Sequence, residues 1–422
     1  MTKASVVRWE EPRAATGARP GTEWSPAVLC PSGPVSYPDA PGSYPRPGVA
    51  TQLPSLASPR TAHDPFPLYR TLRATHPLHL DEPFGAWLLS RYVDVRTALA
   101  DPRLVAPPPG RTFAHLEDDT LTAQRALLAP ALQGRALATL KASIERTAYV
   151  LARRLARRHE ADLVEEFCHW LPAAAVVRAL GLPYEGTAHV AALCRAGLTH
   201  LGGAPEALDA FLRPQIARRR AHPKDDLLSA LCAARIDGRP LSDDTVCGLA
   251  ATLLGAGGDA TDRALAALLA NLLDHPEQLA LVRARPELVD AAWAESLRRD
   301  PAAHVVLRRA LAPVPVSGGT IPAGATVACL VGAAGRDAIR FPDPDRYDLF
   351  RAAPGQLAHG TGRHRCPGVQ LARLTADAGL RALLTELPSM AWAPGFRPAY
   401  EGLLTRSPTA LLVRLQGGRA EA

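Results

Sequence analysis

Apolar residues recur at helical spacing along most of the chain from residue 64 onward. Because apolar positions three and four apart line one face of a helix, the pattern predicts long helices over 122–156, 160–181 and 186–220. A further helix is predicted from Ser242 to beyond residue 270, where Ser242 or Asp243 can accept hydrogen bonds from first-turn N–H groups. At ~1.5 Å per residue this helix would be roughly 45 Å long. A helix that long and that apolar must cross the core.

Strand signals are few and short. They fall at 87–90, 305–310 and 326–330, and glycine-containing turns separate the last two segments. Leucine and alanine, which are strong helix formers, are abundant, whereas long Val/Ile/Thr alternations are scarce. We therefore expect a mainly α fold with a small β region.

Residues 1–62 differ from the rest of the chain. They hold 11 of the 40 prolines together with many Gly and Ser residues, and they show no sustained periodicity. This composition is typical of an irregular leader. The sequence thus predicts a leader over 1–62 and one folded domain over 63–422.

Charge and cysteine usage narrow the classes of function. The net charge is +7, but the basic residues are scattered, so we expect no nucleic-acid partner and favour an acidic protein partner. The seven cysteines show no paired CxxC spacing, which argues against a disulfide framework and for a reducing compartment. No run of eighteen apolar residues occurs. We expect a cytoplasmic monomer without a membrane span.

The segment from Leu357 to Gly368 puts one cysteine, Cys366, after a glycine-rich turn and before a predicted helix. A thiol near a helix N-terminus, with Arg363 and Arg365 beside it, is expected to have a lowered pKa and to present a thiolate to a metal. Two other readings remain at this point: a structural buried thiol, and a zinc site of His359, His364 and Cys366. Structural zinc needs four ligands, and no second cluster supplies the rest.

This segment resembles the haem-binding loop of cytochromes P450, Phe-Gly-x-Gly-x-His-x-Cys-x-Gly, at every fixed position except the first. The resemblance implies the cytochrome P450 fold, haem b (iron protoporphyrin IX) as cofactor and Cys366 as the iron ligand. Its first position, His359, would either alter the hydrogen bonding of the sulfur or face outward. The matching cofactor-binding positions are Gly360, Gly362, His364, Cys366 and Gly368.

Further motifs follow in the order that the same family has them. Glu295 and Arg298, followed by Arg346, resemble its Glu-x-x-Arg and Pro-Glu-Arg-Phe elements. The resemblance implies a buried structural charge network. Arg308 and Arg125 match the family's two haem-propionate arginines, and His364 is the third propionate candidate.

The long central helix departs from the family pattern. The family has Ala/Gly-Gly-x-Asp/Glu-Thr, whereas this chain reads from Ala256 and Gly257 to Asp259, Ala260 and Thr261. The acid that manages protons during oxygen activation is present, but the alcohol is replaced by Ala260. Thr261 is one residue late, which rotates its side chain by about 100° around the helix. The resemblance implies catalytic roles at 259–261 and haem contact at Ala256 and Gly257.

The resemblance also implies a substrate pocket, electron partners and a class of reaction. We expect oxidation of a small-molecule secondary metabolite with O2 and electrons from a ferredoxin and its reductase, docking where Arg363, Arg365 and Arg373 add positive charge. The missing alcohol makes oxidative coupling or cyclisation of an aromatic or peptide-derived substrate the alternative. A non-catalytic haem-binding sensor or scaffold is the alternative from another class. The expected pocket residues are Phe113, Leu253, Ala256, Ala303, His304, Val305 and Leu404.

Overall fold

The computed structural model describes residues 53–106, 123, 125–195, 205–351 and 355–416. Contact clustering separates Met1–Ala50 from a second unit, Thr51–Ala422, and the second unit holds all the described residues. Most of the expected leader therefore lies outside them. Its final part belongs to the second unit, because Leu56 is fully buried and donates its backbone N–H to Asp81 Oδ2 at 2.6 Å. Residues 53–62 thus pack with the domain that was expected to begin at residue 63.

Helices dominate the second unit, as the composition predicts. The α-helices are α1 (Pro59–His63), α2 (Phe66–Thr75), α3 (Tyr92–Ala100), α5 (Gly134–Leu155), α6 (Trp170–Leu180), α7 (Gly186–Arg195), α8 (Pro205–Ala221), α9 (Leu227–Ala233), α10 (Asp243–Asp274), α11 (Pro276–Ala284), α12 (Val289–Arg299), α13 (Val331–Ala334) and α14 (Val369–Glu386). Shorter helical turns are η3 (Ala129–Leu132), the π-helix η4 (Val164–Cys168), η5 (Pro286–Leu288) and η6 (Gly362–His364).

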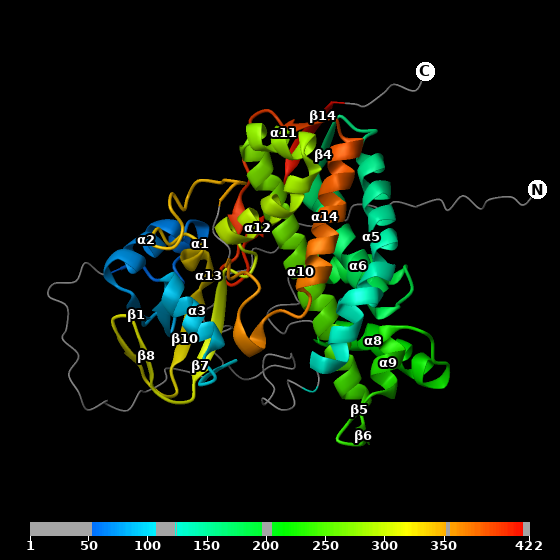
Figure 1. Cartoon of the computed structure of the whole chain (residues 1–422), viewed down its shortest axis with the longest axis horizontal. Helices are drawn as coiled ribbons and strands as arrows, with labels where there is room; N and C mark the ends of the chain where they lie inside the picture. Colours follow the sequence, from blue (N-terminus) through cyan, green and yellow to red (C-terminus); the bar gives the residue numbers. More distant parts are fainter. Residues whose placement is uncertain (1–52, 107–122, 124, 196–204, 352–354, 417–422) are drawn as a thin grey trace, which may run out of the picture. The chain divides into compact units, whose positions relative to one another are not determined.

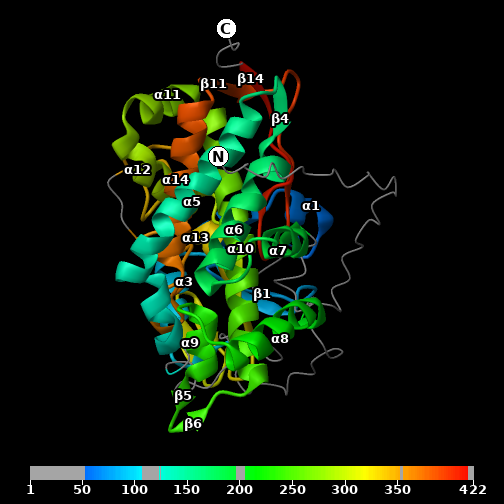
Figure 2. The same cartoon turned by 90° about the vertical axis from the view of Figure 1, so that its right-hand side faces the viewer.

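The predicted central helix is confirmed as α10. The side chain of Ser242 accepts a hydrogen bond from the backbone N–H of Thr245 at 3.1 Å, so it caps the first turn as expected. Most residues of α10 are buried, because α6, α7, α8, α12 and α14 all pack against it. Figures 1 and 2 show α10 running through the helical part beside α6 and α14. The middle of this helix is therefore held on several sides.

The main sheet has five strands in the order β1-β2-β10-β7-β3. Its central strands β7 (Val305–Ala310) and β10 (Thr326–Leu330) match the predicted segments and pair antiparallel, with Val327 opposite Arg308. The other members are β1 (Leu78–Asp81), β2 (Ala86–Leu89) and β3 (Leu104–Val105). This pairing fixes the place of Arg308.

Smaller sheets complete the domain. One has the order β11-β14-β4, and three are two-stranded. Their strands are β4 (Glu160–Asp162), β5 (Arg235–Ile236), β6 (Arg239–Pro240), β8 (Val314–Val316), β9 (Gly319–Ile321), β11 (Ser389–Trp392), β12 (Tyr400–Glu401), β13 (Ser407–Pro408) and β14 (Leu412–Gln416). The hairpin of β12 and β13, here called the C-terminal hairpin, contacts α10.

Of the three long helices predicted before residue 220, the first two are interrupted. The first breaks before α5, where Gly134 has a left-handed φ of +53°. The second begins instead as strand β4, because residues 160–162 pair with the distant strand β14. The third comprises α7 and α8, and residues 196–204 between them lie outside the described residues. Among the described helices, none is long and apolar enough to cross a membrane.

Candidate functional site

The loop before α14 has a backbone that only glycine adopts readily. Gly360 and Gly362 have φ values of +67° and +66°. A Cβ on Gly362 would lie 2.8 Å from the Cα of Ala100, so α3 can approach this loop only because residue 362 is glycine. The loop closes where the backbone N–H of Cys366 donates to the carbonyl of His359 at 2.8 Å. These features hold Cys366 two residues before Gly368, the N-cap of α14.

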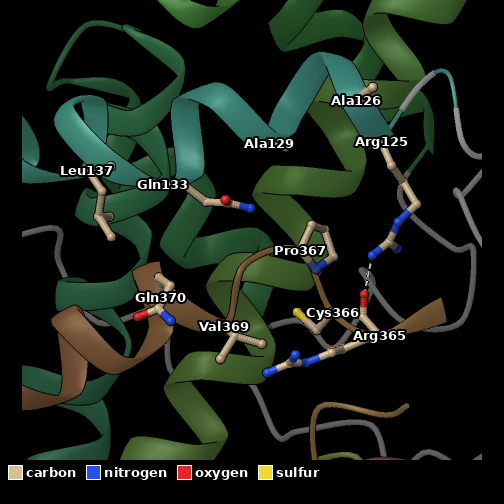
Figure 3. A pocket seen from close by; sticks show the side chains of 11 residues that line it. Arg125, Ala126, Ala129, Gln133, Leu137, Arg365, Cys366, Pro367, Val369 and Gln370 are labelled. Atoms are coloured by element: carbon tan, nitrogen blue, oxygen red, sulfur yellow. Dashed lines mark hydrogen bonds between the residues drawn. The ribbon is translucent and has the colours of Figure 1, made fainter. Parts of the chain in front are cut away.

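Cys366 is exposed to a cavity of about 710 Å³. Figure 3 shows its sulfur beside Pro367 and Val369, with Arg125 and Arg365 nearby. The cavity is lined by Arg125, Ala126, Ala129, Gln133, Gly134, Leu137, Arg365, Cys366, Pro367, Val369 and Gln370. Sequence reasoning missed Gln133, Leu137 and Val369 as lining residues, because they become neighbours only when η3 and α5 pack beside the start of α14.

The thiol of Cys366 differs from the sequence-based expectation. Desolvation by the surrounding protein raises the pKa of this thiol above its ordinary value. A hydrogen bond from the backbone of Gly368 and the charges of Arg125 and Arg365 act in the opposite direction but do not overcome desolvation. The expectation of a lowered pKa is therefore wrong for the protein groups alone. A metal cation at the sulfur would favour the thiolate.

Arg125 also lines this cavity. Its Nη2 donates a hydrogen bond to the backbone carbonyl of Arg365, which Figure 3 marks with a dashed line. Burial lowers the pKa of the Arg125 guanidinium. His364, half-buried in η6, and His359, also half-buried, belong to the same loop. Burial, and then the charge of Arg365, lower the pKa of His359 to about 4, so its ring is neutral at neutral pH.

Arg308 is a buried cation on β7. It is 7% exposed, and its Nη1 donates to the carbonyl of the adjacent Leu307 at 2.9 Å. Its Nε has no hydrogen-bond partner among the described residues. Burial lowers the pKa of this guanidinium, and the charge of Arg363 acts in the same direction. A buried guanidinium of this kind is costly unless an anion accompanies it, so the residues fit a cofactor that carries carboxylates.

The motif residues of α10 lie on two faces of the helix, one accessible and one buried. Ala256 is exposed and Ala260 is half-buried, whereas Thr261 is 7% exposed, which matches the predicted rotation away from Ala260. Gly257 packs against α6: a Cβ there would lie 2.8 Å from Val176 Cγ1. The helix is continuous through these residues, so Gly257 provides close packing of α10 and α6.

Asp259 is held in an ion pair within α10. Its side chain is 1% exposed, and its Oδ1 accepts a hydrogen bond from Arg263 Nε at 2.9 Å. Arg263 also donates from Nη1 to Ser407 Oγ at 3.3 Å. Neither Arg263 nor Ser407 was among the residues predicted from the sequence. The spacing of Asp259 and Arg263, four residues apart on a helix, was a readable signal, whereas the contact with Ser407 depends on the tertiary fold.

Glu295 and Arg298 form the predicted buried charge network, but its third side chain is not Arg346. Arg298 donates to both oxygens of Glu295 at 2.8 Å, and Arg351 Nε donates to Glu295 Oε1 at 3.0 Å. Arg346 is exposed, and its backbone carbonyl accepts from Arg298 at 3.2 Å. The chain turns its Arg346 side chain outward and its Arg351 side chain inward. The assignment of Arg346 is thereby corrected to Arg351.

The expected pocket residues are only partly brought together. Ala303 bridges to Thr405, and the N–H of Val305 donates to the carbonyl of Leu404 at 3.1 Å, so β7 begins beside the C-terminal hairpin. Leu253 is 7% exposed on α10. Phe113 lies outside the described residues.

His304 was expected on the pocket wall but lies in the interior. It is 1% exposed, stacks on Tyr69 with 5.5 Å between ring centroids, and its Nδ1 lies 3.2 Å from Tyr69 Oη. A Cβ on Gly332 would lie 2.1 Å from its Nε2, so the ring rests on that glycine. Burial, and then the charge of Arg406, lower the pKa of His304 to about 3. It is a packed core residue, which corrects its assignment as a substrate contact.

The alternative zinc site finds no geometric support. Across the residues that the structure describes, no three His, Cys, Asp or Glu side chains lie close enough together to hold a metal ion. His359, His364 and Cys366 share a loop, yet they do not converge. The donor set at the cavity is a single thiol with basic side chains around it.

Comparisons with known proteins agree on one family. A family model described as Cytochrome P450 matches residues 208–388. The cytochrome P450 monooxygenase PikC of Streptomyces venezuelae is 34% identical over 385 residues, which cover 85% of this chain and 92% of that protein. The mycinamicin IV hydroxylase/epoxidase of Micromonospora griseorubida is 33% identical over 379 residues, covering 82% and 94%. The solved structure of cytochrome P450 CYP109Q5 from Chondromyces apiculatus is 30% identical with a TM-score of 0.79, covering 87% of this chain and 99% of that one.

Proposed function

Because this chain belongs to the cytochrome P450 family of haem-thiolate oxidoreductases, we propose that it holds haem b through Cys366 and oxidises a small-molecule secondary metabolite with O2. The single observation that carries the proposal is the exposed Cys366 thiol in its glycine-shaped loop at the start of α14. The mycinamicin IV hydroxylase/epoxidase, 33% identical, supports oxygen insertion as the reaction.

The chain's own residues hold the cofactor. Cys366 provides the sulfur ligand, and Gly360 and Gly362 bring the loop backbone close to a flat ring. Arg308, whose buried Nε lacks a partner among the described residues, pairs with a propionate. Arg125 and His364 are the other residues that would pair with the propionates. When bound, the haem supplies the oxidising chemistry, and its thiolate ligand favours O–O cleavage.

Residues of α10 handle the substrate side. Ala256 and Ala260 present small side chains on the accessible face of the helix, which leaves room for a substrate. Asp259, which precedes Ala260, is the carboxyl group that passes protons inward. Since Ala260 has no hydroxyl, a substrate hydroxyl, ordered water or another side chain completes this path.

Turnover in isotopically labelled dioxygen tests the proposed reaction. Reconstituted with ferredoxin, its reductase and a nicotinamide reductant, the enzyme is expected to put one labelled oxygen atom into its product. Formation of product that lacks the label, with a loss of two hydrogens, would contradict oxygen insertion. It would support oxidative coupling or cyclisation instead, which is the second candidate because Ala260 replaces the alcohol.

Electrons are proposed to arrive from a ferredoxin at the surface near Cys366. Arg365 is exposed there, whereas Arg373 is paired with Asp290 and Arg363 donates to the carbonyl of Pro102 at 2.6 Å. Arg365 is therefore the basic side chain best placed to attract an acidic partner. Arg365→Glu is expected to slow reduction by ferredoxin about tenfold at low salt. An unchanged rate, equal to that of the remote variant Arg235→Glu, would contradict this docking surface.

A further inference from the structure

One cation lies on the accessible face of α10, beside the position that lacks a hydroxyl. Ala256, Ala260 and Arg263 are spaced four and three residues apart, which brings them onto one face of the helix. Ala256 is exposed, Ala260 is half-buried, and the Arg263 side chain is 23% exposed. The turns before and after them are largely buried. Arg263 thus extends along the face that Ala260 leaves without a polar group.

Arg263 connects two other groups. Its Nε donates to Asp259 Oδ1 at 2.9 Å, and its Nη1 donates to Ser407 Oγ at 3.3 Å. Asp259 is 1% exposed and Ser407 is 6% exposed, so both contacts are shielded from bulk water. Ser407 belongs to β13, which packs against α10. A hydrogen-bonded chain therefore runs from the acid of α10, through a guanidinium, to a hydroxyl of the C-terminal hairpin.

The other charged groups around Asp259 have partners of their own. Asp262, on the same helix, accepts from His169 at 2.5 Å between Oδ2 and Nδ1, at the end of η4. The charge of Asp259 contributes to raising the pKa of Asp262, although burial is the main cause. On the hairpin side, Arg406 donates to carbonyls of α1. Arg263 is the cation that forms an ion pair with Asp259.

We propose that Arg263 is the positioning residue for the Asp259 carboxylate and that the Ser407 hydroxyl holds Arg263 in place. The C-terminal hairpin then holds in place, from β13, the cation that pairs with the acid of α10. An arginine side chain has many rotamers, and two fixed acceptors at different ends of its planar group select one of them. The effect of this positioning on turnover rests on the proposed function, whereas the geometry at Asp259 does not depend on it.

The protonation state of Asp259 tests the role of Arg263 without turnover. Infrared difference spectra of the full chain are recorded across pH and show the band of a protonated carboxyl group. Removal of the cation in Arg263→Gln is expected to shift protonation of Asp259 upward by about 1–3 pH units. The new band must vanish in the double variant with Asp259→Asn. Arg381→Gln, which removes an exposed i,i+4 partner from Asp377 at 2.8 Å, serves as the matched control and should leave the spectrum unchanged.

Product yield tests the role of Ser407. Ser407→Ala is expected to lower the ratio of product to released hydrogen peroxide about tenfold, because general acid–base groups lose much of their effect when mispositioned. Ser407→Thr, which keeps the hydroxyl, should restore at least half of the wild-type ratio. Ser296→Ala is the control. It removes the hydroxyl of another buried serine, which lies on α12 with its Oγ 3.1 Å from Tyr347 Oη.

The outcomes separate this inference from the proposed function. An Arg263→Gln spectrum identical to wild type would overturn the positioning role, even if the enzyme hydroxylates its substrate normally. A ratio in Ser407→Ala no lower than in Ser296→Ala would overturn the role of the hydroxyl. A wild-type protein that shows no thiolate-type spectrum and forms no product would instead overturn the proposed function, and the infrared titration would still decide the geometry at Asp259.

Discussion

Arg351 donates from Nε to Oε1 of Glu295 at 3.0 Å and completes the buried ion cluster that Arg298 begins. Arg298 also donates to the carbonyls of Gly335 at 2.7 Å and Pro344 at 2.8 Å. The cluster thus ties α12 to the segment that leads toward the Cys366 loop. Because the charges are buried, each depends on all its partners, and the loss of one leaves the others uncompensated.

Arg351 and Arg346 are therefore expected to differ sharply on substitution. Arg351→Ala should lower the free energy of unfolding by about 3–5 kcal/mol, since it leaves a buried carboxylate short of a partner. Arg346→Ala removes an exposed side chain and should change it by less than about 0.5 kcal/mol. Urea unfolding of both variants measures the difference. Equal losses of unfolding free energy in the two variants would support the sequence-based assignment of Arg346.

Gly362 is expected to be essential for the shape of the Cys366 loop. Gly362→Ala should destabilise the protein well beyond the cost of about 1 kcal/mol for a left-handed φ, because its Cβ would lie 2.8 Å from the Cα of Ala100. Gly238→Ala is the matched control: its φ is +75°, and a Cβ there meets nothing within 4 Å. Thermal unfolding and the haem content of both variants measure the effect. A Gly362→Ala protein as stable as Gly238→Ala would contradict the close approach of α3.

Arg308 is expected to affect the haem-free and the haem-bound protein in opposite directions. Arg308→Met should stabilise the haem-free protein by about 1 kcal/mol or more, because a buried donor without a partner is removed. It should speed haem dissociation about tenfold, because a charge-assisted hydrogen bond of ~1.5–3 kcal/mol is lost. Arg309→Met, at the neighbouring exposed arginine, should change neither the stability of the haem-free protein nor the rate of haem dissociation. Transfer of haem to an acceptor protein and thermal unfolding measure the two effects, and a destabilised haem-free variant would argue for a purely structural arginine.

His304 is expected to make the protein sensitive to acid. Its pKa is about 3 in the folded chain against 6.5 for the ordinary group. Since the unfolded state binds the proton more readily, stability is fully present above pH 6.5 and is lost as the pH falls toward about 3. The loss between pH 7 and pH 5 should be about 2 kcal/mol. His304→Gln should reduce this slope, whereas the exposed His222→Gln should not; parallel pH profiles of unfolding for all three proteins would refute the assignment.

The sequence predicted those elements whose signals are local. The cap at Ser242, the length of α10 and the strands β7 and β10 are confirmed because capping oxygens and apolar spacing act within a few residues. The interruption of the predicted helix over 160–181 could not be read, since β4 forms only by pairing with β14, about 250 residues away. The family resemblance likewise identified Glu295 and Arg298, which share a helix, but it did not identify which later arginine turns inward.

In the site, too, local features could be predicted from the sequence and features that depend on tertiary contacts could not. The motif around Cys366 predicted a glycine-rich turn before a helix, and the structure has this turn, with positive φ values at Gly360 and Gly362, before α14. The burial of His304 against Tyr69 could not be foreseen, because it depends on contacts between β7 and α2. The raised pKa of Cys366 was missed for the same reason: desolvation depends on how closely the whole fold surrounds the sulfur.

The carbon monoxide difference spectrum of the reduced protein tests the central claim most directly. The expected result is the Soret maximum that gives the family its name, and its loss in Cys366→Ser. This result would establish that Cys366 holds the haem iron as a thiolate. A maximum at the position of imidazole or protonated-thiol ligation in the wild-type protein would contradict that assignment, and the proposed oxygen-inserting reaction would fall with it.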